Sequence, residues 1–477
     1  MSVLRYLPRF RNLHRELDRM AARESWTREQ LQAWQLERIN RVWRHAIEHV
    51  PHYRSLRSDL SLPSEFGSIS EYTSRVPTLS KQFVRDHTQQ LLSVEALAGK
   101  WCRTGGSTGV PTAVYWSHEA HHEMLRAKYR SEQAYGVRVF DPKVFFWGHS
   151  GSFAPGWSGW MQRLRRPMED RLRKRLRISA YSLGPDSLRQ SLRKIERFEP
   201  VSIYGYASAI DLLAEACDRH RIELPSLKLA IMTAEPADEA MVNRVSQRFG
   251  CPAAVEYGAV ECGLMAYRMP EGRIRTRDDM VLIETIPTAI DSASKADSTD
   301  ENARQRYEIV VTVLNNPSFP LLRYRIADTT DRAWQACPTG MGMLSEIHGR
   351  ANDILVTGSG RRLHSMAVKH VLEHWPEVRR FTARQNHSGK LSVVLETPER
   401  VSDQLVSTLR GKLESIMEGY DVDVATTEAI PGNLAGKHRW IISDLAAKQT
   451  IESSKQTIES CAETVGTFRG DGKSTCS

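Results

Sequence analysis

The sequence has few cysteines, and none stand in the patterns by which cysteines bind metal or pair. Seven are scattered through 477 residues, with no Cys-x-x-Cys pair. This spacing argues against a zinc-ribbon site and against the disulfide framework of a small secreted domain. No apolar stretch approaches the roughly 20 residues of a membrane span, and the basic N-terminus lacks the apolar run of a secretory signal. We therefore expect a protein of the reducing cytoplasm with no integral membrane segment.

Signatures of nucleic-acid binding are missing as well. Neither zinc-finger spacing nor an aromatic RNA-binding motif accompanies the net charge of +9. Much of the excess positive charge lies in "RLRRPMEDRLRKRLR", residues 163–177. Such a run usually forms the solvated face of a helix, the interpretation we favour. The alternative is a docking surface for an anionic ligand such as a phosphorylated cofactor.

What the chain does contain is an alternation of helical and strand patterns. Residues 27–50 repeat apolar side chains at helical intervals after a capping box formed by Thr27 and Gln30. Farther on, the apolar runs "PKVFFWG", "LKLAIMTAEP" and "PAAVEYG" alternate with helical segments. This order predicts an α/β protein whose mainly parallel sheets are flanked by helices.

The pattern changes toward the C-terminus. Two strands, "DMVLIET" and "YEIVVTVL", are separated by a polar insert at residues 286–306. The segment 350–445 has the pattern of a smaller α+β domain, which leaves 1–349 as a large domain with a helical region at about 1–60. Residues 446–477 repeat "KQTIES" and are rich in polar residues, so we predict a disordered tail.

The stretch "RTGGSTGVPTAVYWS", residues 103–117, packs glycines and hydroxyl residues into a short loop. Small residues let backbone N–H groups gather around an anion, and hydroxyls add donors, so the loop has the chemistry of a phosphate cradle. It is neither a Walker A loop nor a G-x-G-x-x-G loop. A flexible linker has the same composition, so the loop alone leaves both interpretations open.

Four motifs follow the loop in order: "EYGAVECG", "LLRYRIADTTD", "IHGRANDILVTGSGRRLH" and "PGNLAGKHR". Together with the loop they resemble the adenylate-forming enzymes, the superfamily of acyl-CoA ligases, luciferases and peptide-synthetase adenylation domains. The N-terminal "WQLERINRVWRHAIEHVPHYR" resembles the branch of phenylacetate–CoA ligase and the CapK-like proteins. The resemblance extends to about residue 445. Each motif is short, but five in the right order are far more specific than one.

The resemblance implies a nucleotide site. The loop would wrap the ATP β- and γ-phosphates, and a segment before the Tyr-Gly motif would approach the adenine beside Tyr257 and Gly258. Asp328 would hold the ribose hydroxyls, and Arg350, in the hinge segment, would reach the ribose or phosphates. The residues matching the loop and the adenine segment are Thr104, Gly106, Ser107, Thr108 and Gly109, and Ala234, Glu235 and Pro236.

Two residues carry the chemistry that the resemblance implies. Glu261 would help to hold Mg²⁺, and Lys437 would bridge the carboxylate and the α-phosphate. The Mg²⁺ ion and the Lys437 ammonium would offset the repulsion between the substrate carboxylate and the α-phosphate. The chain departs from the family pattern at three places: Thr112 stands for a frequent Lys, Val260 for a Thr, and Ile326 and Ala327 for Thr-Gly.

The acyl-binding wall of the family falls on Tyr204 and Ser208 in this sequence, and His149 follows a strand that could line the same pocket. Each has a plainer interpretation: Ser208 as a helix N-cap, and His149 as a hydrogen-bonded structural histidine. We expect Trp147 to belong to the core rather than to this pocket.

The implied reaction has two steps. A carboxylic acid, aromatic by family preference, reacts with MgATP to give acyl-AMP and pyrophosphate; the acyl group then passes to an acceptor. In the family, the small domain is a mobile lid over a site between the domains. Coenzyme A is the expected acceptor, with an amine as the alternative and a carrier-protein thiol third. A non-catalytic nucleotide-binding relative is the alternative of another class, since Val260 and Thr112 depart from the pattern.

Overall fold

The computed structural model divides into two compact units, with the boundary after His348. It describes residues 8–104, 112–147, 167–179, 185–235, 237–288, 306–337, 340–345, 347–350, 354–358, 362–364, 368, 371–372, 375, 377–378, 380–397, 401–428, 430 and 441–444. The predicted tail therefore lies outside the described residues, as do residues 289–305 of the predicted polar insert 286–306.

Five helices open the first unit: α1 (Pro8–Arg23), α2 (Arg28–His49), α3 (Pro51–Asp59), α4 (Ile69–Arg75) and α5 (Lys81–Asp86). The predicted capping box begins α2, because Thr27 accepts from the Gln30 N–H and the Gln30 side chain accepts from the Thr27 N–H. The helix ends at His49, and Pro51 starts α3. The buried face of α2 includes the predicted apolar residues Leu31, Ile39, Val42, Trp43 and Ala46.

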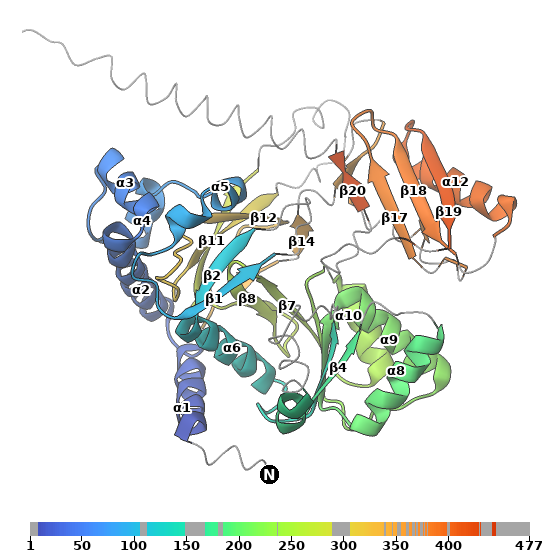
Figure 1. Cartoon of the computed structure of the whole chain (residues 1–477), viewed down its shortest axis with the longest axis horizontal. Helices are drawn as coiled ribbons and strands as arrows, with labels where there is room; N and C mark the ends of the chain where they lie inside the picture. The colour runs from blue at the N-terminus through green and yellow to red at the C-terminus, as the bar shows by residue number, and fades with distance from the viewer. Residues whose placement is uncertain are drawn as a thin grey trace, which may run out of the picture. The chain divides into compact units, whose positions relative to one another are not determined.

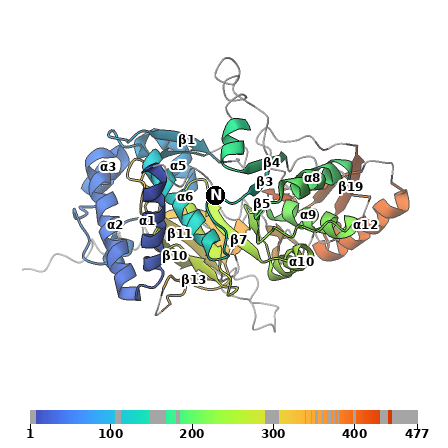
Figure 2. The same cartoon turned by 90° about the horizontal axis from the view of Figure 1, so that it is seen from below.

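An eight-stranded sheet forms the centre of the first unit, in the order β13-β9-β8-β7-β6-β5-β3-β4. Strands β4, β3, β5, β6 and β7 run parallel to one another, as predicted. Strands β8, β9 and β13 continue the sheet with antiparallel pairing. Helices α8 (Pro185–Phe198), α9 (Ala207–His220) and α10 (Glu239–Phe249) pack together against the parallel part (Figures 1 and 2). The strands are β3 (Lys143–Trp147), β4 (Arg175–Ser179), β5 (Ser202–Tyr206), β6 (Leu229–Thr233), β7 (Ala253–Ala259), β8 (Gly263–Arg268), β9 (Ile274–Thr276) and β13 (Met343–Leu344).

A second sheet joins β10 (Val281–Pro287), β11 (Tyr307–Val313) and β12 (Tyr324–Thr330) of the same unit with β14 (Ile347–Arg350), a strand that spans the unit boundary. A two-stranded hairpin of β1 (Gly99–Arg103) and β2 (Ala113–Ser117) leads into α6 (His118–Gln133), and η2 (Thr88–Leu91) precedes it. Residues from these elements and from α2 share one apolar core. The second sheet is thus built around antiparallel pairs, while the predicted parallel arrangement holds for the larger sheet.

The second unit contains a four-stranded sheet in the order β19-β18-β17-β20, on which α12 packs (orange in Figure 1). The core between them includes Phe381, Leu391, Leu409 and Leu413. Its elements are β15 (Ile354–Val356), β16 (Arg362–His364), β17 (Arg380–Gln385), β18 (Leu391–Glu396), α12 (Asp403–Met417), β19 (Val422–Thr427) and β20 (Ile441–Ser443).

The basic segment 163–177 does not form one continuous helix. Residues 167–172 are helical, a turn follows, and Arg175 opens strand β4. The Arg177 guanidinium donates to both carboxylate oxygens of Asp170 at 2.9 and 3.1 Å, and Arg175 lies over the Phe145 ring. The strand arginines are therefore held by neighbours, because Asp170 and the aromatic face offer them partners within the unit.

In the described part of the chain, no helix combines the length and apolar character needed to cross a bilayer. The cysteines among these residues are all free thiols: Cys102, Cys217, Cys251, Cys262 and Cys337. Burial raises the pKa of Cys217 and of Cys251 to about 12, so both stay neutral thiols packed in the core.

His121 on α6 should make stability depend on pH. Burial, together with the Lys100 ammonium, lowers its pKa to about 4, and His122, Lys128 and His118 add to the shift. Between pH 6.5 and 4 the unfolded chain takes up a proton that the folded chain does not, so stability should fall as pH drops. His121→Gln is expected to reduce the slope of the unfolding free energy against pH by the equivalent of a fraction of one bound proton. Urea denaturation at several pH values across that range measures this slope. An unchanged slope would contradict this assignment.

Candidate functional site

The predicted site residues gather where the parallel strands of the large sheet end. Tyr204 lies near the end of β5, Ala234 follows β6, and Tyr257 lies near the end of β7. In open α/β sheets, ligands bind outside these carboxyl ends. The fold thus places the motif residues at the edge where such sheets bind their ligands.

A tight hairpin between β7 and β8 carries Glu261. A Cβ on Gly258 would lie 2.5 Å from the carbonyl oxygen of Gly263, so the two strands approach more closely than a side chain allows. The Trp116 indole N–H donates to the Val260 carbonyl at 2.9 Å. Because Trp116 belongs to β2, this bond ties the turn to the hairpin of the glycine-rich loop.

Glu261 is 3% exposed and accepts two hydrogen bonds on one oxygen. Lys81 Nζ lies 2.8 Å from Oε1, and the Tyr324 hydroxyl donates to the same atom at 3.2 Å. Backbone bonds hold these partners in place, because Leu79 N–H donates to the Arg323 carbonyl and Arg325 N–H donates to that of Leu79. The Lys81 ammonium thus offers this buried carboxylate an opposite charge, as a buried charge requires.

Tyr257 and Asp328 meet across the motifs. The Tyr257 hydroxyl donates to Asp328 Oδ2 at 2.9 Å, which joins β7 to β12. The neighbouring Cys262 is 3% exposed, and burial and Glu261 raise the pKa of its thiol well above its ordinary value. Cys262 is therefore a poor nucleophile, since the thiolate is the reactive form.

Ala327, beside Asp328, has φ +68°, in the left-handed region. Glycine adopts that conformation freely, whereas an L-residue pays about 1–2 kcal/mol. The geometry therefore accounts for the glycine that the family motif has at this position.

The conformation of Ala327 gives a stability prediction. Ala327→Gly relieves strain but adds unfolded-chain entropy, so it should change the unfolding free energy by less than about 1 kcal/mol. Ala327→Val should destabilise by about 2 kcal/mol, because a β-branched residue fits this φ worst. Thermal denaturation of the two variants checks this, and equal destabilisation by both would contradict it.

The glycine-rich segment lies in the sequence between β1 and β2, which pair antiparallel, and α6 begins only after β2, at His118. At its neck, Thr104 N–H donates to the Thr112 carbonyl and Thr112 N–H donates to Thr104 Oγ1, each at 2.9 Å. Thr112 is 1% exposed, so the position where the family often has Lys presents no charge here. The loop residues Gly106, Ser107, Thr108 and Gly109 lie outside the described residues.

The remaining predicted residues differ in how much of them the structure describes. Ala234 is exposed with φ +65° and Glu235 is half-buried, whereas Pro236, His149 and Lys437 lie outside the described residues. The backbone of Arg350 belongs to β14, and its side chain is outside the description. The alternative role of Ser208 as an N-cap is wrong: α9 begins at Ala207 and Tyr206 is its N-cap, so Ser208 lies one residue inside the helix.

Tyr204 has partners that the sequence did not indicate. Its hydroxyl donates to Glu256 Oε1 at 2.8 Å, and Lys128 Nζ lies 2.6 Å from the same oxygen and 3.3 Å from the hydroxyl. Trp147 is half-buried and stacks on Tyr206, with centroids 4.1 Å apart, and on Tyr204 at 5.7 Å. Trp147 therefore belongs to an aromatic cluster at the sheet edge rather than to the apolar core.

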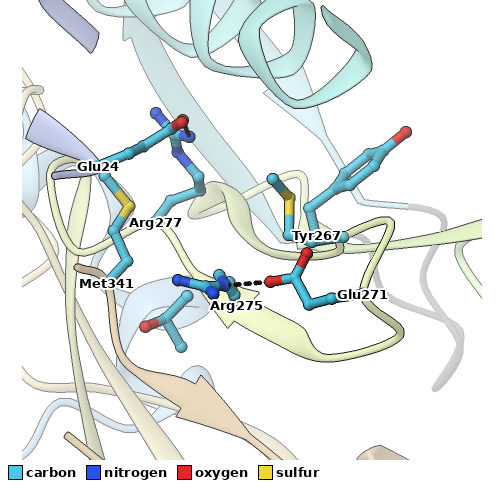
Figure 3. A pocket seen from close by; sticks show the side chains of 8 residues that line it. Glu24, Tyr267, Glu271, Arg275, Arg277 and Met341 are labelled. Atoms are coloured by element: carbon cyan, nitrogen blue, oxygen red, sulfur yellow. Dashed lines mark hydrogen bonds and ion pairs between the residues drawn. The ribbon is translucent and has the colours of Figure 1, made fainter. Parts of the chain in front are cut away.

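A separate hollow in the first unit contains none of the predicted residues (Figure 3). Its volume is about 200 Å³, below the range of roughly 300–1,000 Å³ typical of ligand sites. Its charged side chains pair with one another: Arg275 Nε lies 2.5 Å from Glu271, and Arg277 lies 2.9 Å from Glu24 (Figure 3 labels all four). We therefore do not place the function in this hollow.

No cluster of three or more metal-ligating side chains occurs in the described segments.

Comparison with known proteins identifies relatives along most of the chain, although no protein-family model matches it. Phenylacetate-coenzyme A ligase of Aromatoleum evansii is 26% identical over 347 residues, covering 70% of this chain and 73% of the relative. Protein CapK of Staphylococcus aureus is 23% identical over 288 residues, covering 59% and 60%.

A solved structure of 2-hydroxyisobutyryl-CoA ligase in the postadenylation state has a similar fold, with a TM-score of 0.62 and 17% identity over 91% of this chain and 94% of that one. Sequence matches and fold together confirm the resemblance predicted from the motifs: this chain is similar to the phenylacetate–CoA ligase and CapK branch of the adenylate-forming enzymes.

Proposed function

We propose that this protein is an AMP-forming carboxylate–CoA ligase. An acid attacks the α-phosphate of ATP to give acyl-AMP and pyrophosphate, and the thiol of coenzyme A then takes the acyl group and releases AMP. The observation that carries the proposal is that two motif residues near the end of β7 both bond to β12: buried Glu261 accepts from Tyr324, and Tyr257 donates to Asp328 at 2.9 Å. The similarity to phenylacetate-coenzyme A ligases supports the same reaction.

Each residue has a role that follows from its chemistry. Asp328 can only accept hydrogen bonds when ionised, which suits the two ribose hydroxyls, and Tyr257 orients it. The glycine-rich segment that begins at Thr104 would bind the leaving phosphates through backbone N–H groups. Lys437 would supply an ammonium to the crowded transition state, where a positioned cation acts most strongly.

The residues present fit a magnesium ion, with one qualification about charge. Mg²⁺ in nucleotide sites is usually held by one or two carboxylates plus substrate phosphates and waters, and Glu261 offers one such carboxylate. Because Lys81 Nζ already lies 2.8 Å from Glu261 Oε1, the metal would share the negative charge of Glu261 with the Lys81 ammonium. When bound, Mg²⁺ would neutralise phosphate charge and so assist attack at the α-phosphorus.

The acceptor and the acid belong to the proposal as well. We propose coenzyme A as acceptor because the curated matches include several phenylacetate-coenzyme A ligases, and an aromatic acid because the sheet edge carries Trp147, Tyr204 and Tyr206. The free thiols of the described cysteines fit the reducing cytoplasm as the place of action.

The test is pyrophosphate release from ATP with a panel of carboxylic acids, with and without coenzyme A. We expect release that requires one class of acid, and acyl-CoA only when coenzyme A is present. Asp328→Asn should raise the KM for ATP, whereas Asp423→Asn, at an exposed surface pair with Lys390, should not. ATP binding without pyrophosphate release in the presence of any acid would favour a non-catalytic nucleotide-binding protein. Formation of an amide with an added amine would show that the acceptor is an amine and not coenzyme A.

A further inference from the structure

A basic surface with exposed apolar side chains lies at the outer edge of the large sheet. Strand β4 is the last strand of that sheet, and the helical residues 167–172 lead into it (Figures 1 and 2). The sequence from 163 to 177 has eight arginines and lysines against two acidic residues, a surplus of six in a chain whose net charge is +9. We call the described residues 167–174 the basic edge.

Two large apolar side chains of the basic edge are open to solvent. Met168 is 68% exposed and Leu172 is 63% exposed. They are four residues apart in the helical stretch, so their side chains lie one turn apart on the same face. Among the large apolar residues that the structure describes, only Val94 is more exposed. Apolar residues scattered singly over a surface are ordinary, whereas a pair on one helical face marks a place where something binds.

Three cations lie next to this apolar pair. Arg171, Arg173 and Lys174 are all exposed. Lys174 has φ +48°, and its N–H donates to the Arg171 carbonyl at 3.2 Å, so the chain turns sharply there between the helical residues and β4. The arginines of the strand itself differ, because Arg177 is paired with Asp170 and Arg175 lies over the Phe145 ring. The exposed positive charge is therefore concentrated where the apolar pair is.

Two simpler roles explain only part of this surface. Charged side chains on an edge strand prevent it from pairing with another sheet; this accounts for the arginines of β4 but not for the exposed Met168 and Leu172. A soluble phosphorylated ligand would account for the cations, but it has no use for an apolar face. A membrane surface with anionic lipids takes both, since cations meet the headgroup phosphates while apolar side chains enter the boundary of the acyl chains.

We propose that the basic edge binds the surface of a membrane that contains anionic lipids. Met168 and Leu172 enter the interface, and Arg171, Arg173 and Lys174 contact headgroup phosphates. Each cation close to such a surface strengthens binding about fivefold, so the three together with two apolar side chains give a reversible attachment rather than a permanent anchor. This proposal does not depend on the proposed ligase function, and adds a location to it.

The experiment is co-sedimentation of the full chain with vesicles of phosphatidylcholine alone, or of phosphatidylcholine with about one third phosphatidylglycerol. We expect binding to the second kind only, weakening as salt is added. The variant Met168→Ser with Leu172→Ser keeps every charge and should bind about tenfold more weakly. Joint replacement of Arg171, Arg173 and Lys174 by Gln should weaken binding about a hundredfold.

A matched control removes three exposed charges from the second unit, by Arg384→Gln, Arg410→Gln and Lys412→Gln. It lowers the net charge of the chain as much as the triple variant of the basic edge, and should bind vesicles nearly as the wild type does. Thermal denaturation of each variant shows whether it is folded, and the midpoint should be close to that of the wild type because the replaced side chains of the basic edge are exposed.

Three results would overturn the inference. The first is absence of binding to the anionic vesicles, or equal binding to both kinds. The second is binding that the charge variant loses but the apolar variant keeps in full, which would make the basic edge a site for soluble anions or for an acidic protein. The third is equal loss in the control, which would assign the effect to overall charge. Pyrophosphate release is measured without vesicles, so the ligase proposal is tested separately.

Discussion

Replacing Lys437 with alanine is expected to reduce acid-dependent pyrophosphate release by at least about two orders of magnitude. One ammonium that contacts the transition state contributes roughly 3 kcal/mol, because it neutralises charge where carboxylate and phosphate oxygens crowd together. Folding should be nearly unaffected, since a lysine that acts only in the transition state makes no large contribution to the stability of the free protein.

The measurement combines release kinetics with thermal denaturation. Lys390→Ala removes an exposed lysine paired with Asp423 and serves as the control, with unchanged kinetics. A Lys437→Ala protein that unfolds would assign this lysine a structural role. One that retains full activity would remove it from the chemistry.

The second large effect concerns the buried Lys81–Glu261 pair. Glu261→Gln keeps the shape of the side chain but removes the negative charge, so we expect a loss of about two orders of magnitude in rate and a higher Mg²⁺ requirement. Lys81→Met leaves a carboxylate that is 3% exposed without its ammonium. That variant should be destabilised by about 3 kcal/mol, near the lower end for a broken buried pair because Lys81 is partly exposed.

The double variant separates charge balance from chemistry. Lys81→Met with Glu261→Gln should regain most of the stability lost in Lys81→Met, since no uncompensated charge stays buried, but should not regain activity. Urea denaturation and Mg²⁺ titrations of the four proteins complete the cycle. If Glu261→Gln keeps the wild-type Mg²⁺ requirement, Glu261 is a structural partner of Lys81 and not a metal ligand.

Local patterns in the sequence predicted the elements well. The capping box at Thr27 and Gln30 begins α2, and the predicted strand at 252–258 is β7 (Ala253–Ala259). Motif order also predicted that Tyr257 and Asp328 act together, and their side chains are hydrogen-bonded although 71 residues separate them. Here a resemblance supplied the long-range information that composition and periodicity lack.

Residues that join distant segments without a motif were not predicted. Lys81 pairs with Glu261 across 180 residues, and Lys128 pairs with Glu256 across 128. An isolated lysine on a helix carries no sign of its partner, because its pairing depends on how α5 and α6 pack against the sheets. The wrong N-cap interpretation of Ser208 has a local cause: Tyr206 ends β5 and α9 starts directly after it, without a side-chain cap.

The most direct test of the account follows one oxygen atom. An acid that gives pyrophosphate release, labelled with ¹⁸O in its carboxylate, is incubated with ATP, Mg²⁺ and coenzyme A, and the nucleotide product is analysed by mass spectrometry. We predict AMP that carries one ¹⁸O, because the carboxylate oxygen that attacks the α-phosphorus remains on AMP when the thiol takes the acyl group. Unlabelled AMP, or ADP with labelled phosphate, would contradict activation of the acid as an adenylate.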